Sequence, residues 1–337
     1  MAENRGESVA FTAAYAYNLE NLADLISDLK EIYKIYSIEI AEEMEVLFTD
    51  EHSLYENVIN KNKLLYEYCH SYFSKVCGKK VYISCDIAIE SLRNKANWIK
   101  DHIRRTEWTT DNDGAGWFNG YYDDDSKKVE GIIDGNVRMM LTSQVFTIMS
   151  VVATKEQAKD IIDSADKYLF DEHVGGYRLN TNFNEVKVNL GRMFGFAYGH
   201  KENGAVFSHM SVMYANALYS KGFAKEGFKV IDALYRQVAN FEKSKIYPGI
   251  PEYFDSQGRG MYHFLTGSAS WLMLTVITQI YGVRGKNGNL LLQPKLVKEQ
   301  FDDKGKASIS LSFANRKFNI IYVNESHKDY GEYEIKS

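Results

Sequence analysis

Apolar residues recur every three to four positions over long stretches of this chain, the spacing of one buried stripe along an α-helix. Between residues 19 and 33 the stripe consists of Leu19, Leu22, Leu25, Ile26, Leu29, Ile32 and Tyr33. Proline, which disrupts helix interiors, occurs only three times in 337 residues. The pattern predicts helices over residues 8–48, 51–76, 85–105, 136–150, 154–168, 207–221, 223–242 and 264–281.

Long segments rich in glycine and aromatic residues, 171–206 and 244–263, separate some of these helices. Loops of that length inside a compact domain are usually functional. Helix pairs with elaborate loops at one end indicate an α/α toroid, whose central cleft is floored by such loops. We therefore predict a mainly α fold, an α/α toroid, over residues 1–284.

The pattern changes after residue 284. Apolar and polar residues alternate in segments 289–294, 306–314, 316–324 and 331–336, as in SISLSF and FNIIYV, and Gly, Asp and Asn turns separate them. This alternation predicts a small C-terminal β-sandwich appendage over residues 285–337.

Composition excludes several classes of protein. The net charge of −5 argues against a general nucleic-acid binder. An odd number of cysteines, Cys69, Cys77 and Cys85, favours a reducing compartment over a disulfide scaffold. No signal core or apolar run of membrane length appears, so we expect a soluble cytoplasmic protein. Aromatics make up 14% of the residues, an excess that suits a groove for polar, ring-shaped ligands.

The stretch DGAGWFNGYYDDD, residues 113–125, combines a Gly-rich turn with aromatic rings and carboxylates. Flat faces such as that of Trp117 can pack on the C–H faces of a sugar, while carboxylates accept hydroxyls or donate a proton. A solvated acidic loop is an equally good interpretation of this stretch alone.

Two further stretches are suited to anions. Residues 199–209, GHKENGAVFSH, end at a helix start with a cap near Ser208, where free backbone N–H groups favour negative charge. Residues 262–271, YHFLTGSASW, place hydroxyls and a glycine amide at another helix start. Ordinary helix capping explains either stretch alone, and no His, Asp or Glu set has the spacing of a metal site.

Taken in register, GWFNGYYDDD, HKENGAVFSH and YHFLTGSASW resemble glycoside hydrolase family 94, the cellobiose and chitobiose phosphorylase family. The runs GGYRLNTNFNE and KIYPGIPEYF are most similar to its 1,2-β-oligoglucan phosphorylases, in their C-terminal portion. The resemblance implies an (α/α)6 barrel with flanking β regions. It also implies inverting, reversible phosphorolysis of a β-glucoside to α-glucose 1-phosphate, with inorganic phosphate as co-substrate and no cofactor.

The resemblance implies roles for individual residues. Asp113 matches the general acid, with Asp111 as a second choice because the loop is one residue longer than in cellobiose-type relatives. His209, Thr266 and Gly267 match phosphate-binding positions, and Glu202 matches a glutamate that faces the donor sugar.

The residues themselves support phosphorolysis. One acid beside two anion-suited helix starts favours phosphorolysis over hydrolysis, since phosphate needs no general base to activate it. Asp123, Asp124 and Asp125 are then expected to be turn and solvent-facing residues. Arg178 and Glu252, with Asn180, could line the acceptor side or brace loops equally well.

One departure from the family keeps two functional classes open. An Arg-rich, Asp-containing motif of the family has no match before Asp113, and we expect about four of six helical pairs. The chain is then an active phosphorylase, alone or completed by an N-terminal partner chain, or a non-catalytic remnant that binds a β-glucan or serves as a structural module. An inverting hydrolase is a third alternative. Homodimerisation would cover the apolar surface that a half-barrel leaves.

Overall fold

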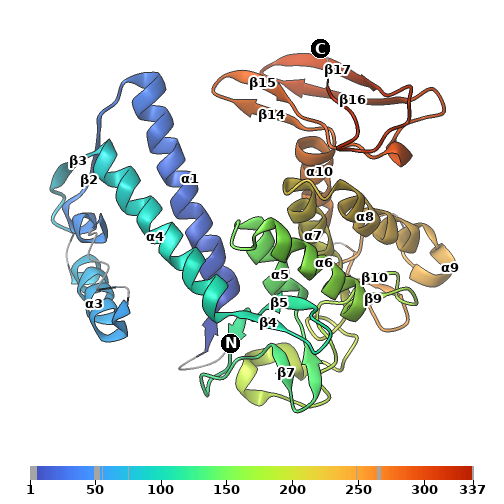
Figure 1. Cartoon of the computed structure of the whole chain (residues 1–337), viewed down its shortest axis with the longest axis horizontal. Helices are drawn as coiled ribbons and strands as arrows, with labels where there is room; N and C mark the ends of the chain where they lie inside the picture. The colour runs from blue at the N-terminus through green and yellow to red at the C-terminus, as the bar shows by residue number, and fades with distance from the viewer. Residues whose placement is uncertain are drawn as a thin grey trace. The chain divides into compact units, whose positions relative to one another are not determined.

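Helices dominate the described part of the chain, as predicted. Its strands form small antiparallel sheets, many of them before residue 284, where no strands were predicted (Figure 1). The computed structural model describes residues 6–335 except 49–53, 55, 75, 248 and 264–266. It divides into two compact units, Phe11–Thr106 and the larger Met1–Ala10 with Glu107–Ser337.

The smaller unit is built on two long helices that pack through small side chains. Its elements are α1 (Val9–Tyr33), β2 (Ser37–Ala41), the 3₁₀ helix η1 (Glu42–Phe48), α3 (Val58–Ser74), β3 (Lys80–Ser84) and α4 (Cys85–Thr106). Ala23, Ala88 and Ala96 are buried in its core with Leu19 and Leu92. Because these alanines are small, α1 and α4 can approach closely.

The helix predicted over residues 8–48 ends at Tyr33, so its second half was wrong. Residues 37–41 form β2, which pairs antiparallel with β3 in the register Ser37↔Ser84 to Ala41↔Lys80. Partners 39 to 47 residues away in the chain satisfy the backbone of this segment, and helical spacing carries no sign of such pairing. Ile38 and Ile83 pack on the core from the two strands.

The larger unit contains helices close to those predicted over 136–150, 154–168, 207–221, 223–242 and 264–281, and also short helical segments at 188–195, 241–244 and 298–300 that were not predicted. They are α5 (Leu141–Met149), α6 (Lys155–Tyr168), η2 (Val188–Gly195), α7 (Ser208–Ser220), α8 (Ala224–Ala239), α9 (Phe241–Ser244), α10 (Ser268–Thr275), the π-helix η3 (Val276–Ile280) and η4 (Lys298–Gln300). Helix α7 packs against α5, α8 and α10 (Figure 1). Ten of its thirteen residues are buried, so α7 is the central helix of this unit.

Short antiparallel pairs connect these helices. The pairs are β1 (Glu7–Ser8) with β6 (Tyr121–Tyr122), β4 (Trp108–Thr110) with β5 (Gly116–Phe118), β7 (Gly131–Ile133) with β8 (Asn136–Arg138), and β9 (Phe170–Asp171) with β10 (Gly176–Tyr177). Strands β11 (Val206–Phe207), β12 (Tyr253–Phe254) and β13 (Gly260–Met261) form one three-stranded sheet.

Two hairpins form the C-terminal β region, β14 (Val283–Lys286) with β15 (Asn289–Leu292) and β16 (Lys306–Phe313) with β17 (Arg316–Val323). Residues 331–335 are irregular, so the strand predicted over 331–336 is wrong across its described part. Tyr219 and Ala224 share a hydrophobic cluster with Leu296 and Ala307, which joins the region to α7 and α8.

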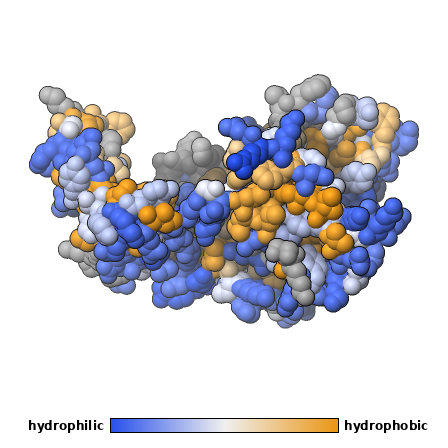
Figure 2. All heavy atoms as spheres, turned by 90° about the horizontal axis from the view of Figure 1, so that it is seen from above, coloured by the Kyte–Doolittle hydropathy of each residue, from blue (hydrophilic) through white to orange (hydrophobic). Residues whose placement is uncertain are grey.

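Apolar side chains also lie on the surface of these hairpins. Ile321 and Val323 are more than half exposed, and Figure 2 shows hydrophobic residues gathered on the face seen from above. Across the described ranges, none of the helices combines the length and the apolar character needed to cross a membrane.

Gly282, at the junction between η3 and β14, has no room for a side chain. Its φ is +64°, and an added Cβ would lie 1.9 Å from the carbonyl oxygen of Gln293. We expect Gly282→Ala to lower the free energy of unfolding by about 2–5 kcal/mol, from backbone strain and overpacking together. Gly288→Ala is the matched control, because its φ is +81° but no atom lies within 4 Å of the added Cβ. Equal losses in denaturant unfolding would contradict the steric explanation.

Candidate functional site

The loop that carries the predicted general acid connects β4 to β5, and Asp111 organises it. Its Oδ1 accepts hydrogen bonds from the backbone N–H groups of Asp113 and Ala115, both at 2.8 Å. Its Oδ2 contacts Lys167 Nζ at 2.8 Å and the Tyr168 hydroxyl. The Lys167 ammonium, followed by the Tyr168 hydroxyl, holds the pKa of Asp111 well below its usual range. Asp111 therefore braces the loop as a carboxylate, and it is a poor second choice for the proton donor.

Asp113 projects from the same loop into solvent. Its side chain is 80% exposed, and its Oδ2 lies 2.8 Å from Lys167 Nζ. A general acid near neutral pH needs burial or a neighbouring negative charge to keep its proton. In this structure Asp113 has solvent and the Lys167 ammonium beside it instead. A bound substrate or phosphate would have to cover Asp113 and bring the negative charge.

The sugar-contacting role predicted for Trp117 does not fit the structure. The residue is completely buried, and its indole N–H donates to the Arg138 carbonyl at 3.1 Å. The Tyr168 ring packs edge-on against it at 5.8 Å between centroids. A side chain without exposed surface has no face for a ligand, so Trp117 is part of the hydrophobic core beneath the loop.

The expectation that Asp123 faces solvent was also wrong. Its side chain is 1% exposed and accepts from the backbone N–H groups of Asp125 and Lys127, both at 3.0 Å. Lys187 Nζ lies 3.3 Å from Oδ2. Burial opposes ionisation, but these amides and the Lys187 ammonium outweigh it and hold the pKa of Asp123 below its usual value.

The predicted phosphate-binding residues His209 and Gly267 lie against each other. His209 is in the first turn of α7 and Gly267 immediately precedes α10. A Cβ added to Gly267 would lie 3.1 Å from His209 Cε1, which shows how closely that backbone approaches the ring. Burial lowers the pKa of His209, which favours the neutral imidazole. Thr266, predicted beside them, lies outside the described residues.

Three buried polar atoms gather within eight residues of this helix start. Glu202 Oε2, Ser208 Oγ and His209 Nε2 have no hydrogen-bond partner in the part of the chain that the structure describes. Ser208 is the first residue of α7, and Phe207 occupies the cap position that was predicted near Ser208. Native proteins satisfy nearly all buried polar groups, and exceptions mark places where a ligand can supply the missing partner.

Each predicted glutamate of this region has a cationic partner. Glu202 pairs with Arg192, and Glu252 Oε2 lies 2.9 Å from Lys201 Nζ. The Lys201 ammonium also lies over the Tyr262 ring, 3.7 Å from its centroid. Neither Lys201 nor Arg192 was a predicted site residue, although Lys201 stands beside Glu202 in the anion-suited stretch.

The three-stranded sheet holds this group together. The backbone N–H of Ser208 donates to the Glu252 carbonyl at 2.9 Å, which ties the α7 start to β12. Arg178 braces the same loop, since its Nε lies 2.9 Å from Asp171 Oδ2 and its guanidinium donates to the Gly204 carbonyl at 2.7 Å. Of the two roles left open for Arg178, its contacts support loop bracing.

Thus the structure brings His209, Gly267, Glu202 and Glu252 into one region, while the hydrogen bonds and ion pairs of Asp113 go to Asp111 and Lys167. No group of three or more His, Cys, Asp or Glu side chains within the described ranges could hold a metal ion.

Comparison with known proteins identifies the family. The model of the glycosyl hydrolase 94 superfamily, catalytic domain, matches residues 63–282. The chain therefore belongs to the glycosyl hydrolase 94 superfamily.

Curated relatives include several phosphorylases. A cellobionic acid phosphorylase of Neurospora crassa is 26% identical over 49% of this chain and 24% of its own length. A 3-O-β-D-glucopyranosyl-β-D-glucuronide phosphorylase of Paenibacillus borealis is 25% identical over 61% of this chain and 27% of its own length. A cyclic β-(1,2)-glucan synthase of Rhizobium meliloti is 26% identical over 60% of this chain and 7% of its own length. The matches span between 7% and 27% of the length of these relatives.

Proposed function

We propose that this chain acts in inverting, reversible phosphorolysis of β-glucosides to α-glucose 1-phosphate, with β-1,2-gluco-oligosaccharides as substrates. Membership of the superfamily and the phosphorylase relatives support a glycoside phosphorylase in general. The β-1,2 linkage rests on the sequence motifs alone.

We further propose that residues 1–284 form part of an (α/α)6 toroid and that residues 285–337 form a separate β region. A cytoplasmic location, also proposed, is consistent with three free cysteines.

The observation that carries the proposal is the group of unpartnered buried atoms at the α7 start. His209 Nε2 and Ser208 Oγ lie at a helix N-terminus, where backbone N–H groups and the helix dipole favour an anion. Gly267 at the start of α10 brings a second helix N-terminus against the His209 ring. A phosphate ion placed there would accept hydrogen bonds from both helices.

In the proposed reaction, phosphate bound by His209, Thr266 and Gly267 attacks the anomeric carbon as the glycosidic bond breaks. Asp113 gives its proton to the departing acceptor oxygen, and Glu202 holds the donor sugar through its free Oε2. Phosphate is anionic at neutral pH, so no second carboxylate has to activate it, in contrast to an inverting hydrolase.

A non-catalytic remnant, or one half of a split enzyme, is the second candidate. One observation favours it: the Asp113 side chain is 80% exposed, and its Oδ2 lies 2.8 Å from the Lys167 ammonium. In this alternative the chain binds a β-glucan without turnover, or turns it over only with a complementing N-terminal chain or as a homodimer.

Phosphate release from α-glucose 1-phosphate with a β-1,2-linked glucobiose acceptor tests the proposed function. Release that requires the acceptor supports phosphorolysis, and release without acceptor indicates hydrolysis. Saccharide binding without release, unchanged by addition of an N-terminal chain, would instead support the remnant.

The anion site makes a pH-dependent prediction that needs no turnover. Since burial keeps the pKa of His209 low, a bound anion must raise it by favouring the imidazolium form. Anion affinity should therefore increase as pH falls, by at most about tenfold per pH unit for one proton taken up. We expect calorimetric titration with sulfate, whose charge is constant between pH 5.5 and 7.5, to show this gain. His209→Gln should bind sulfate weakly at every pH, and an unchanged pH profile would remove His209 from the site.

A further inference from the structure

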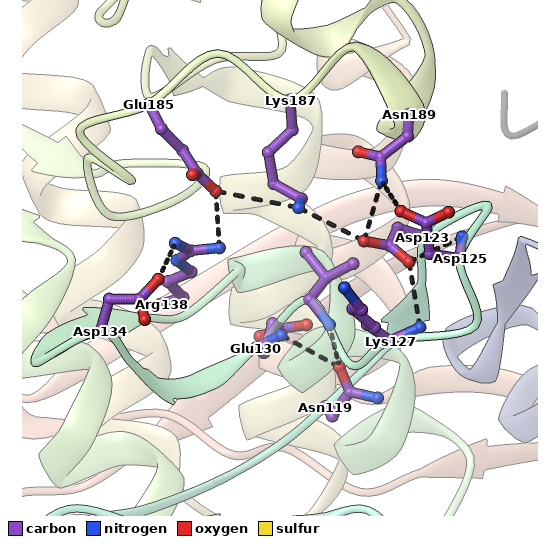
Figure 3. Close-up of polar contacts among 11 residues, drawn as sticks. Asn119, Asp123, Asp125, Lys127, Glu130, Asp134, Arg138, Glu185, Lys187 and Asn189 are labelled. Atoms are coloured by element: carbon purple, nitrogen blue, oxygen red, sulfur yellow. Dashed lines mark hydrogen bonds and ion pairs between the residues drawn. The ribbon is translucent and has the colours of Figure 1, made fainter.

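A second pocket, of about 590 Å³, lies outside the group around His209. Its lining comes from β4, the β7–β8 hairpin, the turn after Asp123 and the segment 185–187 (Figure 3). Acidic and basic side chains alternate around it, including Asp123, Lys187, Arg138 and Glu185. None of these residues has a part in the proposed reaction.

Arg138 is the strongest sign that the pocket receives a ligand. The residue is 3% exposed, and one guanidinium nitrogen lies 2.9 Å from Glu185 Oε1. Its Nε is buried and has no hydrogen-bond partner among the residues that the structure describes. The guanidinium carbon lies over the Phe183 ring, 5.2 Å from its centroid. A buried cationic donor without an acceptor is costly, and a ligand oxygen would satisfy it.

The charged side chains of Asp123, Lys187 and Glu185 are held in place by contacts within the protein. Asp123 is bound by two backbone amides and by Asn189 Nδ2 at 3.1 Å. Lys187 bridges Asp123 and Glu185, at 3.3 and 3.8 Å (Figure 3). Ordered donors and acceptors of this kind reduce the entropy lost on binding.

The mixture of charges selects the class of ligand. A free anion would face Asp123 and Glu185, and a free cation would face Arg138 and Lys187. A neutral molecule with many hydroxyl groups can donate to the carboxylates and accept from the cations. The volume lies within the range of about 300–1,000 Å³ that small-molecule sites usually have.

The pocket is also connected to the proposed active region along the chain. Thr109 lines it and precedes Asp113 by four residues, so their Cα atoms lie within about 14 Å of each other. On the other wall, the segment that carries Lys187 continues into η2, in which Arg192 pairs with Glu202.

We propose that this pocket binds a distal glucose unit of the oligosaccharide, as an additional subsite that favours longer substrates. The inference rests on the proposed function for its substrate class. Lys187 and Glu185 are binding residues in this proposal, and Arg138 supplies the free Nε to a sugar oxygen.

Calorimetric binding of β-1,2-linked gluco-oligosaccharides with two to four units to the full chain tests this subsite. We expect affinity to rise about tenfold from the shortest to the longest ligand. Lys187→Met and Glu185→Gln should remove that gain and leave binding of the disaccharide and of α-glucose 1-phosphate unchanged. Lys245→Met, which breaks a surface ion pair with Glu242, is the control and should retain the gain. Thermal unfolding of each variant shows whether it folds, and Glu185→Gln, at a 42% exposed side chain, preserves the test should Lys187→Met not fold.

The outcomes separate the two proposals. Affinity independent of chain length, with α-glucose 1-phosphate still bound, overturns the subsite and leaves the proposed function standing. No binding of α-glucose 1-phosphate or disaccharide, with longer ligands still bound through Lys187, overturns the proposed function and supports a saccharide site in this pocket. Loss of inorganic phosphate binding in Lys187→Met would identify an anion site and overturn the subsite.

Discussion

Replacing Asp113 by asparagine is expected to lower the rate of disaccharide phosphorolysis by about 10²–10⁴-fold, the usual contribution of a general acid. An amide cannot give the departing oxygen the proton that the carboxyl group supplies. Binding of α-glucose 1-phosphate should persist, because the anion site lies at the α7 start. The rate is measured with the full chain, and with a complementing N-terminal chain where the wild-type protein requires one.

Two variants show whether the effect belongs to Asp113 alone. Glu242→Gln changes a carboxylate that is 87% exposed and lies in neither proposed site, so its rate should equal that of the wild-type protein. Asp111→Asn should lower stability, since an amide loses the ion pair with Lys167 and the oxygen that accepts from the Tyr168 hydroxyl. Wild-type phosphorolysis by Asp113→Asn would exclude Asp113 as the proton donor.

The second large effect is expected at Glu130, a buried carboxyl group behind the acid loop. It accepts hydrogen bonds from the backbone N–H groups of Gly120 at 2.9 Å and Met140 at 2.7 Å. It also accepts from Ser143 Oγ and from Gln144 Nε2 at 3.2 Å. Glu130→Ala leaves the two buried amides without an acceptor, at about 1–3 kcal/mol each. We expect denaturant unfolding to show a loss of about 4 kcal/mol, against less than about 0.5 kcal/mol for the exposed Glu172→Ala.

The pH dependence of stability gives an independent measurement of Glu130. Burial raises its pKa to about 8, because desolvation outweighs the four hydrogen bonds that favour the carboxylate. Between about pH 5 and 8 the folded state then holds a proton that the unfolded state has lost. The free energy of unfolding should therefore fall as pH rises, by on the order of 1 kcal/mol per pH unit, and level off above pH 8. The same slope in Glu130→Ala would assign the effect to other groups.

The sequence predicted helices best where the apolar spacing is long and continuous. The helix predicted over 85–105 corresponds to α4, and the one over 154–168 to α6, which Thr154 and Gln157 begin with reciprocal hydrogen bonds. Both results follow from local physics, since helix hydrogen bonds and caps join residues three or four positions apart. Residues 37–41 were misassigned because their partners lie in β3.

Site residues divide along the same line. The residue types of Glu202, His209 and Gly267 indicated an anion-suited region. The structure places His209 against Gly267, and phosphate binding there stays a prediction. The burial of Trp117 and Asp123 had no signal in the sequence, because an aromatic or acidic residue in a Gly-rich loop suits a surface equally well.

By itself, the sequence determined the superfamily and the mainly helical class. These depend on residue types at short spacing, which local periodicity and motifs record. Only the tertiary structure decided that Asp111 braces its loop as a carboxylate, that Trp117 belongs to the core, and that Arg138 is buried with a free Nε beside a charged pocket. Burial and pairing arise when residues distant in the chain come together, and the pKa and hydrogen bonding of a side chain depend on those neighbours.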